Sequence, residues 1–215
     1  MARQLRAEQT RTTIITAAAD LFDRRGYEAT SLSDIVQHAR VTKGALYFHF
    51  RAKDDLAQAI LELQSTTSRR ISRDLERRGY SSLESLMRLT FGITRLAVEG
   101  PVLRAGLGLA TAGVPVRPPL RHPFTEWLEL ASARLDGAVE ESDLHPDIDV
   151  DAVAHSVVSS FVGTRVVGRA LEPVARQPRR VAGMWRLLVR GLVPVPRRPH
   201  YARLAVHLER GPAPV

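Results

Sequence analysis

The stretch SLSDIVQHARVTKGALYFHF occupies residues 31–50 and decides the fold. Ser31 and Asp34 form a Ser-x-x-Asp capping box, which predicts a helix that begins after Ser31. Thr42 predicts the start of a second short helix, because its hydroxyl can accept a hydrogen bond from an otherwise unpaired backbone N–H. Two short helices about a tight turn are typical of a helix-turn-helix, whose second helix enters the DNA major groove. Apolar residues recur at helical spacing in the first helix: Leu32, Ile35, Val36 and Ala39.

The second helix of this stretch has a face suited to DNA. Gly44 and Ala45 have almost no side chain, so the helix can approach a base edge or a phosphate closely. Lys43 adds a cation, and the helix N-terminus adds partial positive charge. The same residues also fit the exposed face of an ordinary helical hairpin, and the spacing alone leaves that alternative open. The candidate DNA-binding residues are Thr30, Ser31, Ser33, Thr42, Lys43, Gly44, Ala45, Tyr47, Phe48, His49 and Lys53.

The run from Thr30 to Leu56 resembles the DNA-binding signature of the TetR family of bacterial transcriptional repressors. The matching segments are residues 30–32, 35–36, 41–50 and 53–56. The turn before Val41 departs from the pattern, because Arg40 stands where the family usually carries glycine. A non-glycine residue in a left-handed conformation costs roughly 1–2 kcal/mol. We therefore expect a slightly different turn, with additional positive charge near the DNA.

The composition favours a folded, DNA-binding protein. The 215 residues carry a net charge of +8, which favours a polyanionic partner. Residues 1–53 hold nine basic and five acidic residues, so this quarter of the chain carries about +4, half of the total. The chain contains no cysteine, which excludes disulfides and thiolate metal sites. No secretory signal and no apolar run of about 18 residues is found, so we expect a cytoplasmic protein without membrane contact.

The rest of the chain predicts an all-α fold in two domains: a helix-turn-helix domain at residues 1–52 and a helical regulatory and dimerisation domain at residues 53–215. A connector helix at 53–77 would span roughly 35 Å. Ser81 and Glu84 form a second capping box that opens the next helix. Residues 113–123 contain four prolines and cannot be helical. Further helices are predicted at about 8–25, 102–112, 123–142, 149–171, 178–193 and 200–209.

The helices at 149–171 and 178–193 are apolar on more than one side. Such helices need cover from two directions, so we expect a homodimer that forms a four-helix bundle from both copies. A core within one chain is the alternative. The dimer fits the DNA prediction, because two helix-turn-helix domains (the reading heads) on one palindromic operator supply the contact area that a single domain lacks.

The segments at 100–120 and 122–131 and the region around Trp185 resemble a narrower group of that family, the γ-butyrolactone autoregulator receptors. This resemblance implies a repressor that a small apolar effector releases from DNA, with Trp127 at the ligand site. A receptor-like protein that responds to another metabolite, such as an antibiotic or an intermediate, and a DNA-binding regulator without a ligand remain alternatives. The two tryptophans also fit an ordinary core. The candidate effector-binding residues are Trp127, Trp185, Phe91, Thr90 and Phe161.

The sequence gives no indication of an enzyme. The seven histidines lie apart, and neither a nucleophile elbow nor a phosphate-binding loop occurs. Asp147, Asp149 and Asp151 alternate as in a calcium loop, but Ala152 and Val158 stand where that loop needs glycine and a carboxylate. Acidic residues at a helix N-terminus explain the cluster better. We therefore predict no catalytic residues, no metal site and no cofactor.

Overall fold

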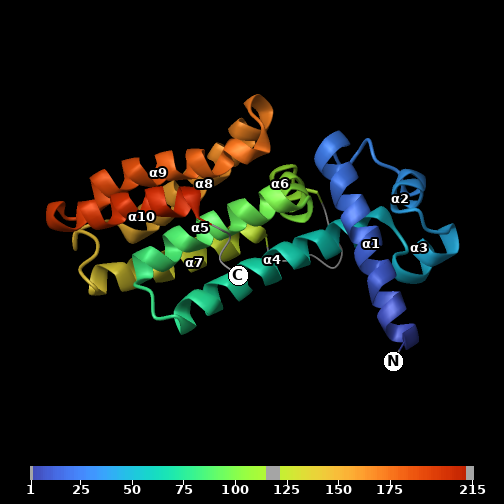
Figure 1. Ribbon diagram of the computed structural model, residues 1–215, viewed down its shortest axis with the longest axis horizontal. Helices are drawn as coiled ribbons and strands as arrows, with labels where there is room; N and C mark the ends of the chain where they lie inside the picture. Colours follow the sequence, from blue (N-terminus) through green and yellow to red (C-terminus); the bar gives the residue numbers. More distant parts are fainter. Residues whose placement is uncertain (1, 115–121, 212–215) are drawn as a thin grey trace. The chain divides into compact units, whose positions relative to one another are not determined.

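The computed structural model of the chain describes residues 2–114 and 122–211, and within these ranges it contains helices and no strand, as the all-α prediction requires (Figure 1). None of the described helices combines the length and the hydropathy needed to cross a membrane. The elements are α1 (Ala2–Arg25), α2 (Leu32–Ala39), α3 (Lys43–His49), α4 (Lys53–Arg77), α5 (Ser82–Glu99), α6 (Val102–Thr111), α7 (Pro123–Glu140), α8 (Val150–Leu171), η1 (Val174–Arg176), α9 (Gln177–Leu192), η2 (Val195–Arg197) and α10 (Arg198–Arg210).

The helix boundaries follow the sequence patterns closely, with α1 as the main difference. The expected start of this helix is residue 8, because its apolar stripe begins only at Ile14, yet α1 begins at Ala2. The added residues include Gln, Leu, Arg and Ala, which favour helix without needing a buried face. The predicted non-helical segment at 113–123 lies largely outside the described residues, which omit 115–121.

The chain divides into two compact units. The N-terminal unit comprises residues 1–66 and 100–123, and the C-terminal unit comprises residues 67–99 and 124–215. The continuous helix α4 begins in the first unit and ends in the second. The domain boundary expected after residue 52 stays a prediction; the compact units place residues 53–66 and 100–123 with the N-terminal helices.

In the N-terminal unit, α1 packs against α2, α3 and α6. Ile14, Ala18 and Phe22 of α1 are buried, as the apolar stripe predicts. The seven-residue helix α3 is too short to be stable alone, and it depends on the fully buried Leu46 and on the buried Phe50 just after it. Burying one such side chain contributes about 1.5–3 kcal/mol. The guanidinium of Arg11 lies 5.3 Å from the Phe50 ring centroid and ties α1 to the end of α3.

In the C-terminal unit, α9 packs against α5, α8 and α10, and these helices lie side by side (Figure 1). The core is apolar, with Leu83, Met87 and Phe91 of α5 buried. Arg95 is also buried, and its guanidinium donates a hydrogen bond to the carbonyl of Leu208 in α10. Burial lowers the pKa of Arg95, because the charged form is costly in an apolar environment. The hydrogen bond to Leu208 offsets part of this cost.

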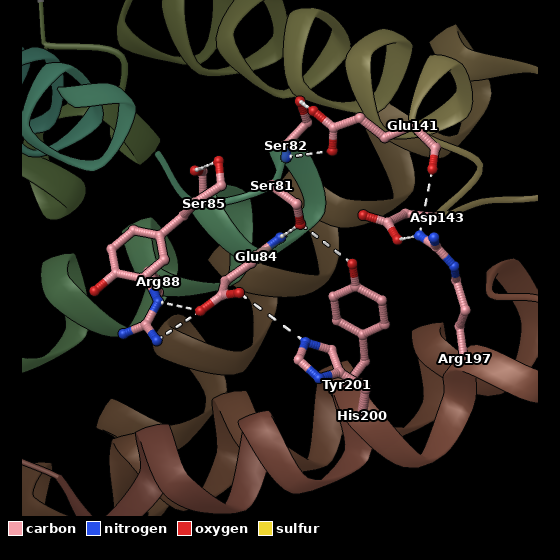
Figure 2. A network of polar contacts seen from close by, with 11 residues as sticks. Ser81, Ser82, Glu84, Ser85, Arg88, Glu141, Asp143, Arg197, His200 and Tyr201 are labelled. Carbon is pink, nitrogen blue, oxygen red and sulfur yellow. Dashed lines mark hydrogen bonds and ion pairs between the residues drawn. The ribbon is translucent and has the colours of Figure 1, made fainter. Parts of the chain in front are cut away.

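A polar network fixes the start of α5 (Figure 2). The Ser81 hydroxyl accepts from the backbone N–H of Glu84 at 3.3 Å, so half of the expected capping box forms. The Glu84 carboxylate does not return to Ser81; it accepts instead from Arg88 at 2.7 Å. The backbone N–H of Ser82 donates to Glu141 at 2.8 Å, which joins the start of α5 to the end of α7. An ion pair within α5 has therefore replaced the second hydrogen bond of the box.

Candidate DNA interface and effector cavity

The capping box at the start of α2 forms as predicted. The Ser31 hydroxyl accepts from the backbone N–H of Asp34 at 3.1 Å, and the Asp34 carboxylate accepts from the backbone N–H of Ser31 at 2.9 Å. Hydrogen bonds from the Ser31 side chain and backbone hold the pKa of Asp34 below its usual value. Asp34 therefore stays ionised at neutral pH and fixes the first turn of α2.

The turn between α2 and α3 keeps the left-handed geometry despite Arg40, which has φ 52° and ψ 43°. The slightly different turn expected from a non-glycine residue is therefore not seen. The Arg40 N–H donates to the Gln37 carbonyl and the Val41 N–H donates to the Val36 carbonyl, both at 3.2 Å. These hydrogen bonds satisfy the last carbonyls of α2 and offset the strain at Arg40.

Helix α3 presents cationic and aromatic side chains to solvent. The Thr42 hydroxyl accepts from the backbone N–H of Ala45 at 3.1 Å and caps the helix as predicted. Lys43 and Gly44 are exposed, and Ala45 and His49 are half-buried. Tyr47 is 54% exposed and Phe48 is 79% exposed. An exposed lysine can pair with a phosphate, and exposed aromatic rings can contact sugars or thymine methyl groups.

The other predicted DNA-binding residues differ in exposure. Ser31 and Ser33 are exposed at the start of α2. Thr30 is buried, and its hydroxyl donates to the Gly26 carbonyl at 2.8 Å. Lys53 is half-buried; its ammonium donates to the Tyr27 carbonyl at 2.9 Å and lies 4.2 Å from the Tyr27 ring centroid. Thr30 and Lys53 therefore also fix the segment between α1 and α2.

Sequence reasoning left out Arg51, a basic residue that is exposed between α3 and α4. Its backbone N–H donates to Asp55 at 2.7 Å, so its position is fixed by the start of α4. The signal that could have found it is its place immediately after α3, next to the residues already chosen.

The C-terminal unit contains an apolar cavity of about 30 Å³. This volume holds about one water molecule. Its walls come from α4, α5, α7 and α8: Ser68, Leu86, Leu89, Thr90, Ile93, Trp127, Leu130, Ala131, Val157, Val158 and Phe161.

Three of the five predicted effector-binding residues line this cavity, namely Thr90, Trp127 and Phe161. The Trp127 ring centroid lies 5.8 Å from that of Phe124 and 6.1 Å from that of Phe161. These three rings form one aromatic cluster that joins α7 with α8, and two of them, Trp127 and Phe161, line the cavity.

The other two predicted residues, Phe91 and Trp185, are almost fully buried and are not among the lining residues. The Trp185 indole N–H donates to the Thr90 hydroxyl oxygen at 2.8 Å. Thr90 in turn donates to the Met87 carbonyl at 2.8 Å. Trp185 therefore lies behind the cavity wall and fixes Thr90, while Phe91 faces the core next to Thr90.

Sequence reasoning did not select Ser68, although it lines the cavity. A signal was present, because Ser68 falls on the buried stripe of α4 with Ile60, Gln64, Ile71 and Leu75. A polar residue on such a stripe needs either a partner or a function.

Large apolar side chains are also exposed along α8, η1 and α9: Val166, Val167, Leu171, Val174 and Leu187. Leu171 is 77% exposed. A groove beside them is lined by Gly163, Val167, Gly168 and Leu171 among others. A Cβ atom at Gly163 would meet no heavy atom within 4 Å, so the surface is open at this position. An exposed apolar face of this kind is typical of a protein–protein contact.

No group of three or more His, Asp or Glu side chains gathers as a metal site in the part of the chain that the structure describes. The alternating aspartates precede and begin α8. The Asp149 carboxylate accepts from the backbone N–H of Ala152 at 3.1 Å and caps this helix. Asp151 lies in the first turn of α8, where a negative charge is favoured by the helix dipole.

Two family models match the chain. Residues 14–60 match the bacterial regulatory proteins of the tetR family, and residues 80–194 match the tetracyclin repressor-like C-terminal domain. The first match covers α2 and α3, and the second covers most of the C-terminal unit.

Individual proteins are similar over most of the chain. The A-factor receptor protein of Streptomyces griseus is 38% identical over 86% of this chain, which spans 64% of that protein's length. A crystal structure of a gamma-butyrolactone receptor, described as an ArpA-like protein, is 69% identical, with a TM-score of 0.87 and coverage of 95% of this chain and 98% of that one. CprB from Streptomyces coelicolor, solved with its biological operator sequence, is 69% identical, with a TM-score of 0.90 and coverage of 96% and 100%.

Proposed function

The chain belongs to the TetR family of bacterial regulatory proteins, and from this premise we propose that it is a dimeric repressor that binds a palindromic operator and leaves it when a small apolar effector binds. The observation that carries the proposal is the presence, in one chain, of a helix with exposed cationic and aromatic side chains and of an apolar cavity. The relatives support it, because CprB was solved with operator DNA and another similar protein is described as a gamma-butyrolactone receptor.

Helix α3 is the proposed reading helix. Lys43 pairs with a phosphate, Gly44 and Ala45 let the start of the helix approach the DNA, and Tyr47 and Phe48 contact sugars or base edges. Ser31, Ser33, Thr42 and His49 complete the proposed interface on both helices of the motif. Thr30 and Lys53 contribute mainly by holding the segment around Tyr27, as their hydrogen bonds to Gly26 and Tyr27 suggest.

The proposed dimer uses the exposed apolar face of α8 and α9. The pairing of two copies covers Val167, Leu171 and Leu187, which are otherwise in water. Two copies also place two reading helices on one symmetric DNA site. Replacing Val167 and Leu171 by glutamate is expected to give monomers in sedimentation experiments and to weaken operator binding by more than about a hundredfold, because a single head has too little contact area. If the double variant stayed dimeric, the dimer contact would not lie at Val167 and Leu171.

The proposed effector site is the cavity around Trp127, Thr90 and Phe161, with Trp185 and Phe91 supporting its wall. A γ-butyrolactone-like molecule is much larger than about 30 Å³, so its binding requires the walls to move apart. The lining residue Ser68 belongs to α4, which also begins next to α3. A displacement of α4 can therefore reach the reading head, provided that the effector binds the displaced state more tightly.

The proposal assigns no reaction and no cofactor to the chain. Its partners are double-stranded DNA, the effector and a second copy of itself. It acts in the cytoplasm, where the operator is accessible.

Footprinting on genomic DNA with and without a γ-butyrolactone tests the proposal. We expect the protein to protect a symmetric DNA site and to lose this protection when the intact lactone is added. The ring-opened hydroxy acid is the matched control, and we expect it to be inactive, because a carboxylate in an uncharged cavity carries a large desolvation cost. Release only by an antibiotic or an intermediate would change the effector class. Protection that no small molecule releases would contradict the effector part.

A further inference from the structure

The hydroxyl of Ser68 is buried without a hydrogen-bond partner. Ser68 is 4% exposed, and its oxygen is one of a few buried polar side-chain atoms in the described ranges that lack a partner. Buried polar groups are nearly always paired, and each exception requires an explanation.

Other helical hydroxyls in this chain behave differently. Thr10, Thr12 and Thr13 each donate to the carbonyl four residues earlier, at 2.9–3.0 Å. The buried Thr94 does the same with the Thr90 carbonyl at 2.7 Å. This bond within the helix is the usual way in which a helical Ser or Thr hydroxyl is satisfied. The Ser68 hydroxyl makes no such bond, so its hydrogen-bonding capacity remains available where it lines the cavity.

The remaining lining residues have few free groups that could form a hydrogen bond with a polar group of the ligand. Thr90 already donates to Met87 and accepts from Trp185. The Trp127 indole has one N–H, which can only donate. The other lining side chains are hydrocarbon, and no charged residue is among the described residues that line the cavity. Among the described residues that line the cavity, Ser68 therefore has a hydroxyl without a partner, which can both donate and accept a hydrogen bond.

We propose that the Ser68 hydroxyl recognises a neutral oxygen of the effector and so selects, among apolar molecules, those that carry a carbonyl or hydroxyl group in reach of α4. The inference rests on the proposed function, since it names a contact within the same cavity. The ligand class is a mainly apolar, uncharged molecule with an ester, lactone, ketone or alcohol oxygen. A charged ligand is disfavoured because the described lining supplies no counter-ion.

The test compares two probes on the full chain: an alkyl-substituted γ-butyrolactone and the matching cyclic ether, which lacks the carbonyl oxygen. Binding is followed by tryptophan fluorescence and by release of operator DNA. For Ser68→Ala we expect about tenfold weaker binding of the lactone and unchanged binding of the ether. Ser85→Ala is the matched control, because Ser85 is a buried serine of α5 outside the cavity, and we expect it to change neither.

Thermal unfolding separates recognition from a structural role. We expect Ser68→Ala to be at least as stable as the unchanged chain, because the variant removes an unpaired buried hydroxyl. If the lactone released the unchanged chain and Ser68→Ala at the same concentration, the Ser68 proposal would be overturned and the proposed function would stand. If neither the lactone nor the ether bound the unchanged chain, the effector function itself would be overturned, and the Ser68 proposal with it.

Discussion

The α3 helix and the cavity use aromatic side chains in opposite ways. Phe48 on α3 is 79% exposed, whereas Trp127 in the cavity wall is 8% exposed. Around Phe48 lie an exposed lysine and short side chains, which suit a charged and hydrated polymer. Around Trp127 lie mainly hydrocarbon side chains and about 30 Å³ of space, and no charged residue is among the described lining residues. The proposed interface can meet DNA as it stands, but the proposed effector site must change shape to receive a ligand.

This difference has an energetic consequence. The DNA binding proposed for α3 draws mainly on phosphate charge and therefore depends on salt. Binding in the cavity draws on buried apolar area and must also separate packed walls, so its net free energy depends on how easily these walls move. Variants at the two places are therefore expected to change different observables.

The largest expected effect is at the cavity wall. Trp127→Ala is expected to weaken the effector response by about a hundredfold, because the indole supplies a large part of the apolar surface that the proposed effector contacts. Operator affinity without effector is expected to stay within a few-fold, which also reports that the variant folds. Tyr201→Phe is the control, because Tyr201 is a buried aromatic residue of α10 that does not line the cavity. A Trp127→Ala chain that still leaves DNA at normal effector concentrations would place the effector elsewhere.

A smaller effect is expected at the reading helix. Lys43→Ala should weaken operator binding about tenfold, and it should reduce the slope of log affinity against log salt by about 0.9 for each phosphate that Lys43 neutralises. The effector affinity should not change. Arg203→Ala, which removes an exposed arginine of α10, is the control. A fluorescence anisotropy titration at several salt concentrations measures the operator affinity and its salt slope. An unchanged slope would show that Lys43 does not contact DNA.

The caps of the two short helices should affect stability more modestly. Ser31→Ala and Thr42→Ala each remove a hydrogen bond to a backbone N–H at 3.1 Å and are expected to lower the free energy of unfolding by about 1 kcal/mol. Denaturant titration measures the loss. Ser33→Ala, on the exposed face of α2, should cost clearly less, and an equal loss at Ser33 would mean that the caps are not the source.

The smallest effect is expected at the left-handed turn. Arg40→Gly relieves a penalty of roughly 1–2 kcal/mol but adds glycine's freedom in the unfolded chain, so a net gain of about 0.5–1 kcal/mol is expected. Arg40→Lys keeps the charge and should give no gain. If Arg40→Gly also reduces the salt slope of operator binding, Arg40 contacts phosphate. A loss of stability would show that the arginine side chain supports the turn.

The local part of this architecture could be predicted residue by residue. The Ser31–Asp34 box, the Thr42 cap and the left-handed Gly26 involve groups within a few positions of one another, so the sequence pattern specifies them directly. The same is true of the end of α4 and the start of α8, where glycine or aspartate marks the boundary.

The cavity could be predicted only in part. Thr90 and Phe91 are adjacent on α5 and both buried, yet only Thr90 lines the cavity. Helical periodicity says that a residue is buried, but it does not say which other helix covers it. Ser68 was missed for the same reason, since its role appears only when α4 is packed with α7 and α8. Non-local packing, which has no short sequence signature, decides these positions.

The central claim is that the cavity and the reading helix are coupled through one chain. Linkage requires that the effector weaken operator binding by the same factor by which the operator weakens effector binding. The decisive measurement is the effector affinity of the unchanged chain, from its tryptophan fluorescence, with and without saturating operator duplex. The account predicts that operator DNA weakens effector binding by the factor found in the reverse titration, whereas a scrambled duplex leaves it unchanged. Equal effector affinity with and without operator would contradict the coupling.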